Sequence, residues 1–135
     1  MRYRIINNIS SIDITIHDTK EDTVTNKRSK GLTQPMYYML LSLKRPRHGY
    51  EMMQYIGWLT DGRVKVGPGT LYSLLARFED DGYIKMIDAN DNKKTYMITD
   101  LGTQIVDEEV ERLELLLKDA SRVIGGYDSE FQNRE

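Results

Sequence analysis

The stretch Gly67-Pro68-Gly69-Thr70, in the middle of the chain, has the composition of a phosphate-binding loop. The Walker type of loop needs G-x-x-x-x-G-K-[ST], because its lysine reaches the phosphates that the backbone N–H groups cradle. This stretch has neither that spacing nor a lysine. We therefore interpret it as the start of a helix, with Pro68 in the first turn, where the missing N–H costs nothing.

Other catalytic or metal-binding patterns are equally incomplete. The stretch Asp88–Asn92 imitates the first five positions of a calcium loop, but Lys93 stands where that loop needs glycine and Thr99 where it needs glutamate. His17 and His48 are far apart in the sequence, and the chain contains no cysteine. We therefore predict no metal site, no cofactor and no enzymatic activity.

Length and composition indicate an ordinary globular protein. The chain has 135 residues, of which 39% are hydrophobic and 30% charged, so we expect one compact core. No run approaches the roughly 18 consecutive apolar residues that span a membrane, and the first residues lack the apolar region of a signal peptide. These observations predict a cytoplasmic protein that does not bind membranes.

Charge is unevenly distributed along the chain. The net charge is −2, with an isoelectric point near 5.7. Residues 30–100 carry ten basic and eight acidic side chains, whereas residues 101–135 carry four basic and nine acidic ones. Any anion-binding surface is therefore expected upstream of the acidic C-terminal stretch.

Two helices are predicted in the first part of the chain. The first is capped by Thr33, has Pro35 in its first turn and is stopped by Pro46. The second follows Gly49 and ends near Gly62 in a left-handed conformation, before a short β-like run, RVKV. The residues expected to be buried are Met36, Met39, Leu40 and Leu43 in the first helix, and Met52, Met53, Ile56 and either Leu59 or Trp58 in the second.

A third helix, a hairpin and a last helix follow. The third helix buries Leu71, Leu74, Leu75 and Phe78, and Gly82 ends it. The segments YIKMID and KKTYMIT flank ANDN, which predicts a β-hairpin, and Thr99 caps the last helix. That helix has a heptad seam, which predicts a contact with a second copy of the chain. The seam consists of Val106, Val110, Leu113, Leu117, Ala120 and Ile124, and it is widened by Leu116 and Val123.

Three helices, a short strand and a hairpin in this order predict a mainly α protein with a small β-hairpin, a winged helix-turn-helix followed by a C-terminal dimerisation helix. We divide the chain into a polar N-terminal extension (1–29), the winged helix (30–98), the dimerisation helix (99–126) and a polar tail (127–135). The extension has no clear periodicity beyond a weak alternation in IDITIHD.

Three blocks carry a resemblance to a known family: PMYYMLLSLKRPRHGYEMMQ, VGPGTLYSLLARFEDDGYI and KKTYMITDLG. Their order and spacing over residues 32–102 resemble those of the PadR family of bacterial transcriptional regulators, in the subgroup that dimerises through one C-terminal helix. The resemblance implies a repressor that binds double-stranded DNA and is often relieved by a small molecule. Residues 1–29 have no counterpart in it. The last helix lacks tryptophan, so the aromatic ligand clamp of some short members is not carried over.

The predicted DNA-binding residues lie on three elements. The third helix would enter the major groove, with its positive N-terminal end toward a phosphate. The hairpin would act as the wing, and the start of the second helix would lie near the backbone. The candidates are Tyr50, Gly69, Thr70, Tyr72, Ser73, Arg77, Lys93 and Lys94, each of which could also be simply solvated.

The partners expected from this assignment are a pseudo-palindromic DNA operator, a second copy of the chain and a small-molecule effector. The acidic isoelectric point favours an alternative, a winged-helix module that dimerises and binds proteins without binding DNA.

Overall fold

The computed structural model describes residues 31–126 and 128–134. They belong to two compact parts, one containing the described residues up to 106 and the other those from 107, and each is described by itself. The predicted polar extension, residues 1–29 with IDITIHD, lies outside the described residues.

The first helix, α3 (Gln34–Ser42), forms as the sequence predicts. The Thr33 hydroxyl oxygen accepts a hydrogen bond from the Met36 N–H at 3.3 Å, and Pro35 occupies the first turn. Met39, Leu40 and Leu43 are fully buried, while Met36 is half-buried. The helix ends at Ser42, well before Pro46, which follows the turn at residues 43–44.

The second helix, α4 (Gly49–Leu59), buries a narrower face than predicted. Met52 and Ile56 are fully buried, but Met53 is half-buried. The prediction that Leu59 or Trp58 is buried is wrong, since they are 39% and 72% exposed. Met52, Ile56 and Thr60 follow one another at a spacing of four residues, so they lie on one side of the helix, and all three are buried. Trp58 lies on the opposite side.

The run RVKV is not a strand, in contrast to the prediction. Val64 and Val66 are buried in a loop, which Thr60 anchors because its hydroxyl accepts a hydrogen bond from the Val64 N–H at 3.1 Å. The short strand is instead β1 (Arg47–His48), whose residues pair with Tyr96 and Thr95. A strand of two residues is too short to produce a readable alternation.

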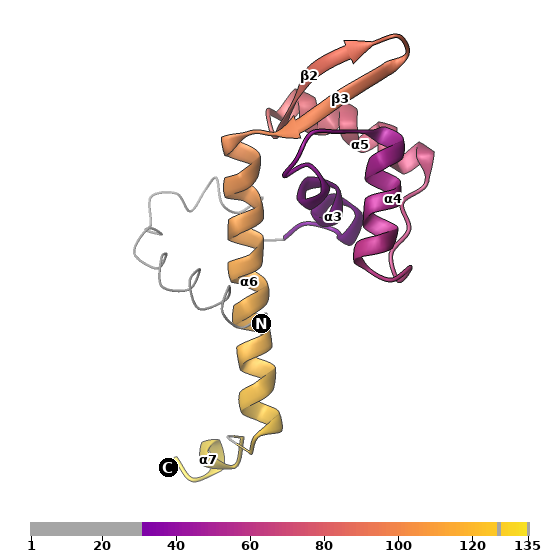
Figure 1. Cartoon of the computed structure of the whole chain (residues 1–135). Coiled ribbons are helices and arrows are strands. Elements are labelled where there is room, and N and C mark those ends of the chain that lie inside the picture. Colours follow the sequence, from indigo (N-terminus) through magenta and orange to yellow (C-terminus); the bar gives the residue numbers. More distant parts are fainter. Residues whose placement is uncertain (1–30, 127, 135) are drawn as a thin grey trace. The chain divides into compact units, whose positions relative to one another are not determined.

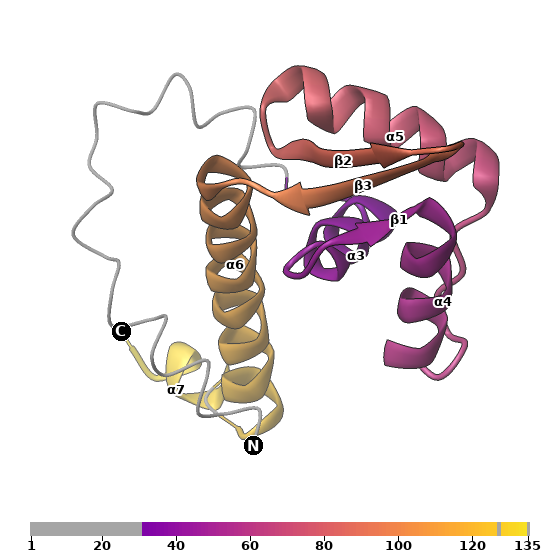
Figure 2. The ribbon, with the colours of Figure 1, turned by 45° about the horizontal axis from the view of Figure 1, so that its top comes forward.

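The third helix, α5 (Pro68–Asp81), and the hairpin form where the sequence predicts them, although Leu74, which was predicted to be buried, is half-buried. Leu71, Leu75 and Phe78 are buried, and Gly82 ends the helix with a left-handed φ of 81°. Strands β2 (Ile84–Asn90) and β3 (Lys93–Ile98) form an antiparallel sheet with β1 in the order β1-β3-β2. Figures 1 and 2 show the hairpin running along α5, and Figure 2 shows β1 beside β3, which confirms a winged helix-turn-helix.

The hairpin turn is tighter than predicted. Strand β2 extends to Asn90, two residues further than expected, while β3 begins at Lys93 as predicted, so that Asn90 pairs with Lys93 and Asp91 and Asn92 form the turn between the strands. Asp91 adopts a left-handed φ of 56°, which aspartate tolerates better than most residues. The candidate calcium stretch is therefore the end of a strand and its turn.

The last long helix, α6 (Asp100–Ile124), starts against the wing. The Thr99 hydroxyl accepts a hydrogen bond from the Gly102 N–H at 3.1 Å and donates one to the Gly82 carbonyl at 2.7 Å, so Thr99 caps the helix as predicted. At Gly102 a side chain would collide with the Tyr83 carbonyl and with Ile98. This close approach joins the first turn of α6 to the sheet.

The residues from 107 onward comprise the rest of α6 and a short helix, α7 (Asp128–Gln132), in the stretch predicted to be a polar tail. Arg112 donates two hydrogen bonds to the buried Glu109 carboxylate, at 3.1 and 2.6 Å. Hydrogen bonding to Glu109 raises the pKa of the Arg112 guanidinium. No helix within the described ranges is long and apolar enough to cross a membrane.

Candidate nucleic-acid interface

The N-terminus of α5 is open to solvent. Gly67 precedes the helix in an extended conformation and provides no side-chain cap, and the first helical bond runs from the Leu71 N–H to the Gly67 carbonyl at 2.9 Å. The N–H groups of Gly69 and Thr70 lie before this bond and so have no acceptor within the helix. Both residues are exposed, and no atom of the residues that the structure describes lies within 4 Å of where a side chain on Gly69 would begin. An anion can approach these groups directly.

The outward face of α5 is polar and carries the predicted contacts. Thr70, Tyr72, Ser73 and Arg77 are all exposed, whereas the opposite face is in the core. Arg77 makes a long contact with Asp81, 3.8 Å between Nε and Oδ2, at a largely exposed site. Such a contact contributes little and leaves the guanidinium available to a ligand.

Charge along α5 is polarised. Its first turn contains no acidic residue, while Glu79, Asp80 and Asp81 are exposed at its C-terminal end. The helix dipole adds a partial positive charge at the first turn and a partial negative charge at the last. A phosphate is therefore attracted to the N-terminal half of α5 and repelled from the other end.

The start of α4 packs against this half of α5. A side chain added to Gly49 would begin 2.9 Å from the Tyr72 hydroxyl and 3.0 Å from the Leu71 side chain, so the start of α4 lies close against these two residues of α5. Tyr50 follows on α4 and is 61% exposed, and Tyr72 is 58% exposed. The structure thus brings the two predicted tyrosines to neighbouring helix turns.

The N-terminus of α4 differs from that of α5. The Glu51 carboxylate accepts a hydrogen bond from the His48 N–H at 3.1 Å and lies 3.6 Å from His48 Nε2. A negative side chain already occupies the place that a phosphate would take. Among the predicted backbone contacts, Tyr50 must therefore act through its side chain.

Lys93 and Lys94 are exposed directly after the hairpin turn and lie opposite Asn90 and Ala89. Successive residues of a strand point to opposite faces of the sheet, so Lys94 shares a face with Tyr96 and Lys93 does not. Burial raises the pKa of the Tyr96 hydroxyl, and the charge of Glu79 and the neighbouring Tyr72 raise it further. Because both of these residues are on α5, the face that carries Lys94 is the one turned toward that helix.

The predicted dimerisation seam is only partly available as a surface. Val106 is buried within the chain and Val110 is half-buried. Further along α6 the apolar side chains are exposed, including Leu117 at 54% and Val123 at 57%. The exposed members of the stripe are Leu113, Leu116, Leu117, Ala120, Val123 and Ile124.

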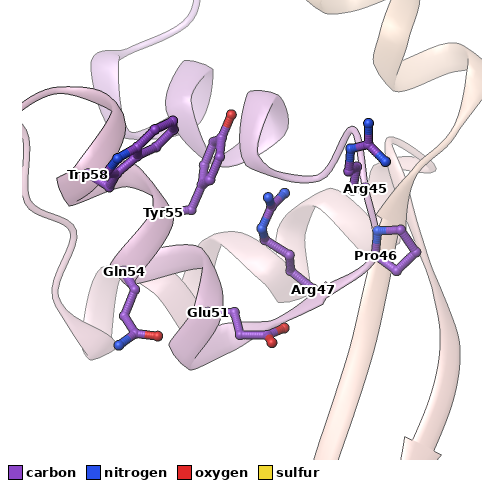
Figure 3. Close-up of a pocket in the computed structure, with 7 residues that line it drawn as sticks. All are labelled: Arg45, Pro46, Arg47, Glu51, Gln54, Tyr55 and Trp58. Carbon is purple, nitrogen blue, oxygen red and sulfur yellow. The ribbon is translucent and has the colours of Figure 1, made fainter.

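A surface that the sequence analysis did not select lies on the outward side of α4 (Figure 3). The side chains of Tyr55 and Trp58 lie next to each other, and Arg47 points toward Tyr55. The available signal was Arg-Pro-Arg followed by two aromatic residues three positions apart. We call this the Trp58 surface, and it is lined by Arg45, Pro46, Arg47, Glu51, Gln54, Tyr55 and Trp58.

Among the described residues, no three histidine or acidic side chains come together as a metal site.

The chain is similar to known transcriptional regulators. A protein of Escherichia coli named transcriptional regulator YqjI is 30% identical over 69 residues, which are 51% of this chain and 33% of that protein. The chain thus matches only about a third of the length of this relative. A transcriptional regulator from Clostridium thermocellum superposes with a TM-score of 0.56 at 29% identity, over 64% of this chain and 88% of that one.

A PadR family transcriptional regulator from Eggerthella lenta shares the fold, with a TM-score of 0.58 at 22% identity over 78% of this chain and 92% of the other. Residues 39–108, half of the chain, match the Transcriptional regulator PadR-like family. This match covers α4, α5 and the whole sheet, the elements that form the candidate interface. The chain therefore belongs to the PadR-like family of transcriptional regulators.

Proposed function

We propose that the protein is a homodimeric transcriptional repressor that binds a pseudo-palindromic DNA operator with α5 in the major groove. The observation that carries this proposal is the open N-terminus of α5, which combines exposed, unbonded N–H groups with a polar outward face and no acidic residue in its first turn. DNA phosphates favour such a helix end through both hydrogen bonds and the dipole.

Different parts of α5 have different roles in the proposal. Gly69 and Thr70 bind a phosphate through their N–H groups, which positions the helix without selecting a sequence. Ser73 and Arg77 lie further along the same exposed face, where side chains of a recognition helix reach base edges. Tyr72 and Tyr50 reach the backbone with their hydroxyl groups. The acidic C-terminal end of α5 then faces away from the duplex.

The wing lysines supply further phosphate contacts. Lys93 and Lys94 lie on opposite faces of the hairpin, so the duplex meets them unequally. We expect replacement of both by alanine to weaken binding to all sequences about equally and to lower the log–log salt slope by roughly 1 to 2 per half-site. The single variants Lys93→Ala and Lys94→Ala should differ in how much DNA affinity each of them loses.

The exposed stripe of α6 supports the dimer. Apolar side chains that remain exposed on one helix face are buried when a second copy packs against them, and a two-fold dimer presents two recognition helices to two half-sites. A small molecule that relieves repression would be recognised by the same apolar stripe, between the paired helices. It would be detected as a loss of operator affinity when the compound is added.

The experiment that tests the proposal is a titration of the full chain against DNA from its own promoter region and against random duplex, across a salt series. We expect operator binding that falls linearly in log salt and exceeds random binding. An absence of salt-sensitive binding would refute DNA recognition and favour a protein-binding module. Salt-sensitive binding without any preference for promoter DNA would refute the proposal that the protein recognises a specific operator sequence.

A further inference from the structure

The Trp58 surface is held in place by interactions among its own residues. The Arg47 guanidinium lies 4.0 Å from the centre of the Tyr55 ring and donates a hydrogen bond to the Ser42 carbonyl through Nη1. The rings of Tyr55 and Trp58 are 5.6 Å apart between centres. Two contacts therefore hold the Arg47 guanidinium in place, and the surface is preorganised for a partner.

The Trp58 side chain is not part of the core of the winged helix. Trp58 is 72% exposed and lies opposite the buried side of α4. Tryptophan, tyrosine and arginine are the residue types that dominate binding energy in protein interfaces, where a partner covers them from water. An exposed Trp58 next to Tyr55 and Arg47 therefore indicates a docking site for a protein segment.

The chain itself contains a segment of complementary chemistry. Residues from 107 onward carry nine acidic and four basic side chains, whereas the Trp58 surface carries Arg45 and Arg47 against the single acidic Glu51. At the end of the acidic segment, Phe131 of α7 is 68% exposed, and the Arg134 guanidinium lies over its ring at 4.7 Å. Glu130 precedes it and is also exposed.

We propose that α7 of a second copy of the chain docks on the Trp58 surface. Phe131 of that copy packs on the rings of Tyr55 and Trp58, and Glu130 pairs with Arg45 or Arg47. In a two-fold dimer the contact forms twice, once for each α7, so a single pair of complementary surfaces contributes two contacts. The inference goes beyond DNA binding, because it requires the dimer and not the operator.

The chain contains one tryptophan, so the fluorescence of Trp58 reports on this surface alone. The full-length chain and its Phe131→Ala variant are compared by acrylamide quenching, with Gln132→Ala as the matched control on the same short helix. We expect Phe131→Ala to raise the quenching constant about twofold, because a docked aromatic ring excludes water and quencher from Trp58. The control should behave as the wild type. Equal quenching in the wild type and in Phe131→Ala would overturn the proposal.

The absence of cysteine permits a second test that identifies which copy supplies α7. Full-length Gln54→Cys and Ser129→Cys variants, each with one cysteine, are mixed under mild oxidation, and disulfide-linked peptides are identified by mass spectrometry. We expect a 54–129 link between the two chains, and its yield should fall severalfold when the Ser129→Cys chain also carries Phe131→Ala. The absence of a 54–129 link between the two single-cysteine chains would overturn docking by a second copy, even if a separate chain that carries both cysteines forms the link within itself.

Discussion

Helix α5 and the part of α6 from residue 107 are both amphipathic, but they use their two faces in opposite ways. In α5 the apolar side chains Leu71, Leu75 and Phe78 are buried in the winged helix, and the polar face is left to solvent. In α6 the apolar stripe that includes Leu113 and Leu117 is itself exposed.

The difference shows that amphipathicity alone does not tell what a helix binds. A helix whose apolar face is satisfied within the chain has only its polar face to offer, and in α5 that face suits DNA. A helix whose apolar face is exposed within its own chain can bury that face against a partner, and in α6 that face suits a second helix. The four predictions below change one face at a time.

The largest effect is expected from Leu113→Asp combined with Leu117→Asp. Each leucine that is buried between two helices contributes on the order of 1.5–3 kcal/mol, and the double variant replaces two per chain with charges. We expect monomers in analytical ultracentrifugation with an unchanged circular dichroism spectrum. Leu115→Asp is the matched control, because Leu115 is exposed but lies two residues from each, on the other side of the helix. A folded double variant that stays dimeric would place the interface elsewhere.

The next effect belongs to the apolar face of α5. Phe78 is fully buried, so Phe78→Ala is expected to lower the free energy of unfolding by about 3–5 kcal/mol in urea denaturation. Leu115→Ala, at an exposed position of α6, is expected to change it by less than about 0.5 kcal/mol. A loss below about 1 kcal/mol for Phe78→Ala would contradict the view that α5 has satisfied its apolar face within the chain.

The polar face of α5 is tested by Ser73→Ala and Arg77→Ala. If either side chain contacts a base, its loss should cost roughly 1–3 kcal/mol of operator binding and relax the preference at one position of each half-site. The measurement is a competition between operator and base-substituted duplexes at fixed salt. Lys118→Ala removes one positive charge outside α5 and controls for net charge. If both variants still bind the operator with an unchanged sequence preference, the protein binds DNA but does not read its bases with Ser73 and Arg77.

Much of the fold could be predicted because its signals are local. Thr33 and Thr99 were identified as caps, and Gly82 as a helix end, since one residue's chemistry determines each of these features. The strand β1 could not be found, because two residues have no periodicity and pair only when the hairpin is already placed.

The errors on α4 and α6 have a different cause. Leu59 or Trp58 was expected in the core because large apolar residues are often buried, but the face of α4 set by Met52 and Ile56 leaves both of them exposed. Val106 was assigned to the dimer seam, yet the chain buries it by itself. A heptad pattern identifies an apolar face but does not tell where along the helix the protein's own core ends.

The smallest effect concerns the boundary between the two faces of α5, at Gly69. Alanine fits there without contact, and it raises helix stability by up to about 1 kcal/mol over glycine, so Gly69→Ala should unfold at slightly higher urea concentration. The Cα–Cβ bond tilts toward the helix N-terminus, so the new methyl group points to where a phosphate would lie. We therefore expect operator and random duplex affinity to fall together, severalfold, while stability rises. Gly57→Ala on α4, where a side chain also meets open space, should give the gain in stability alone. If both variants gain stability and neither loses DNA affinity, no phosphate approaches the start of α5, and its open N-terminus has another role.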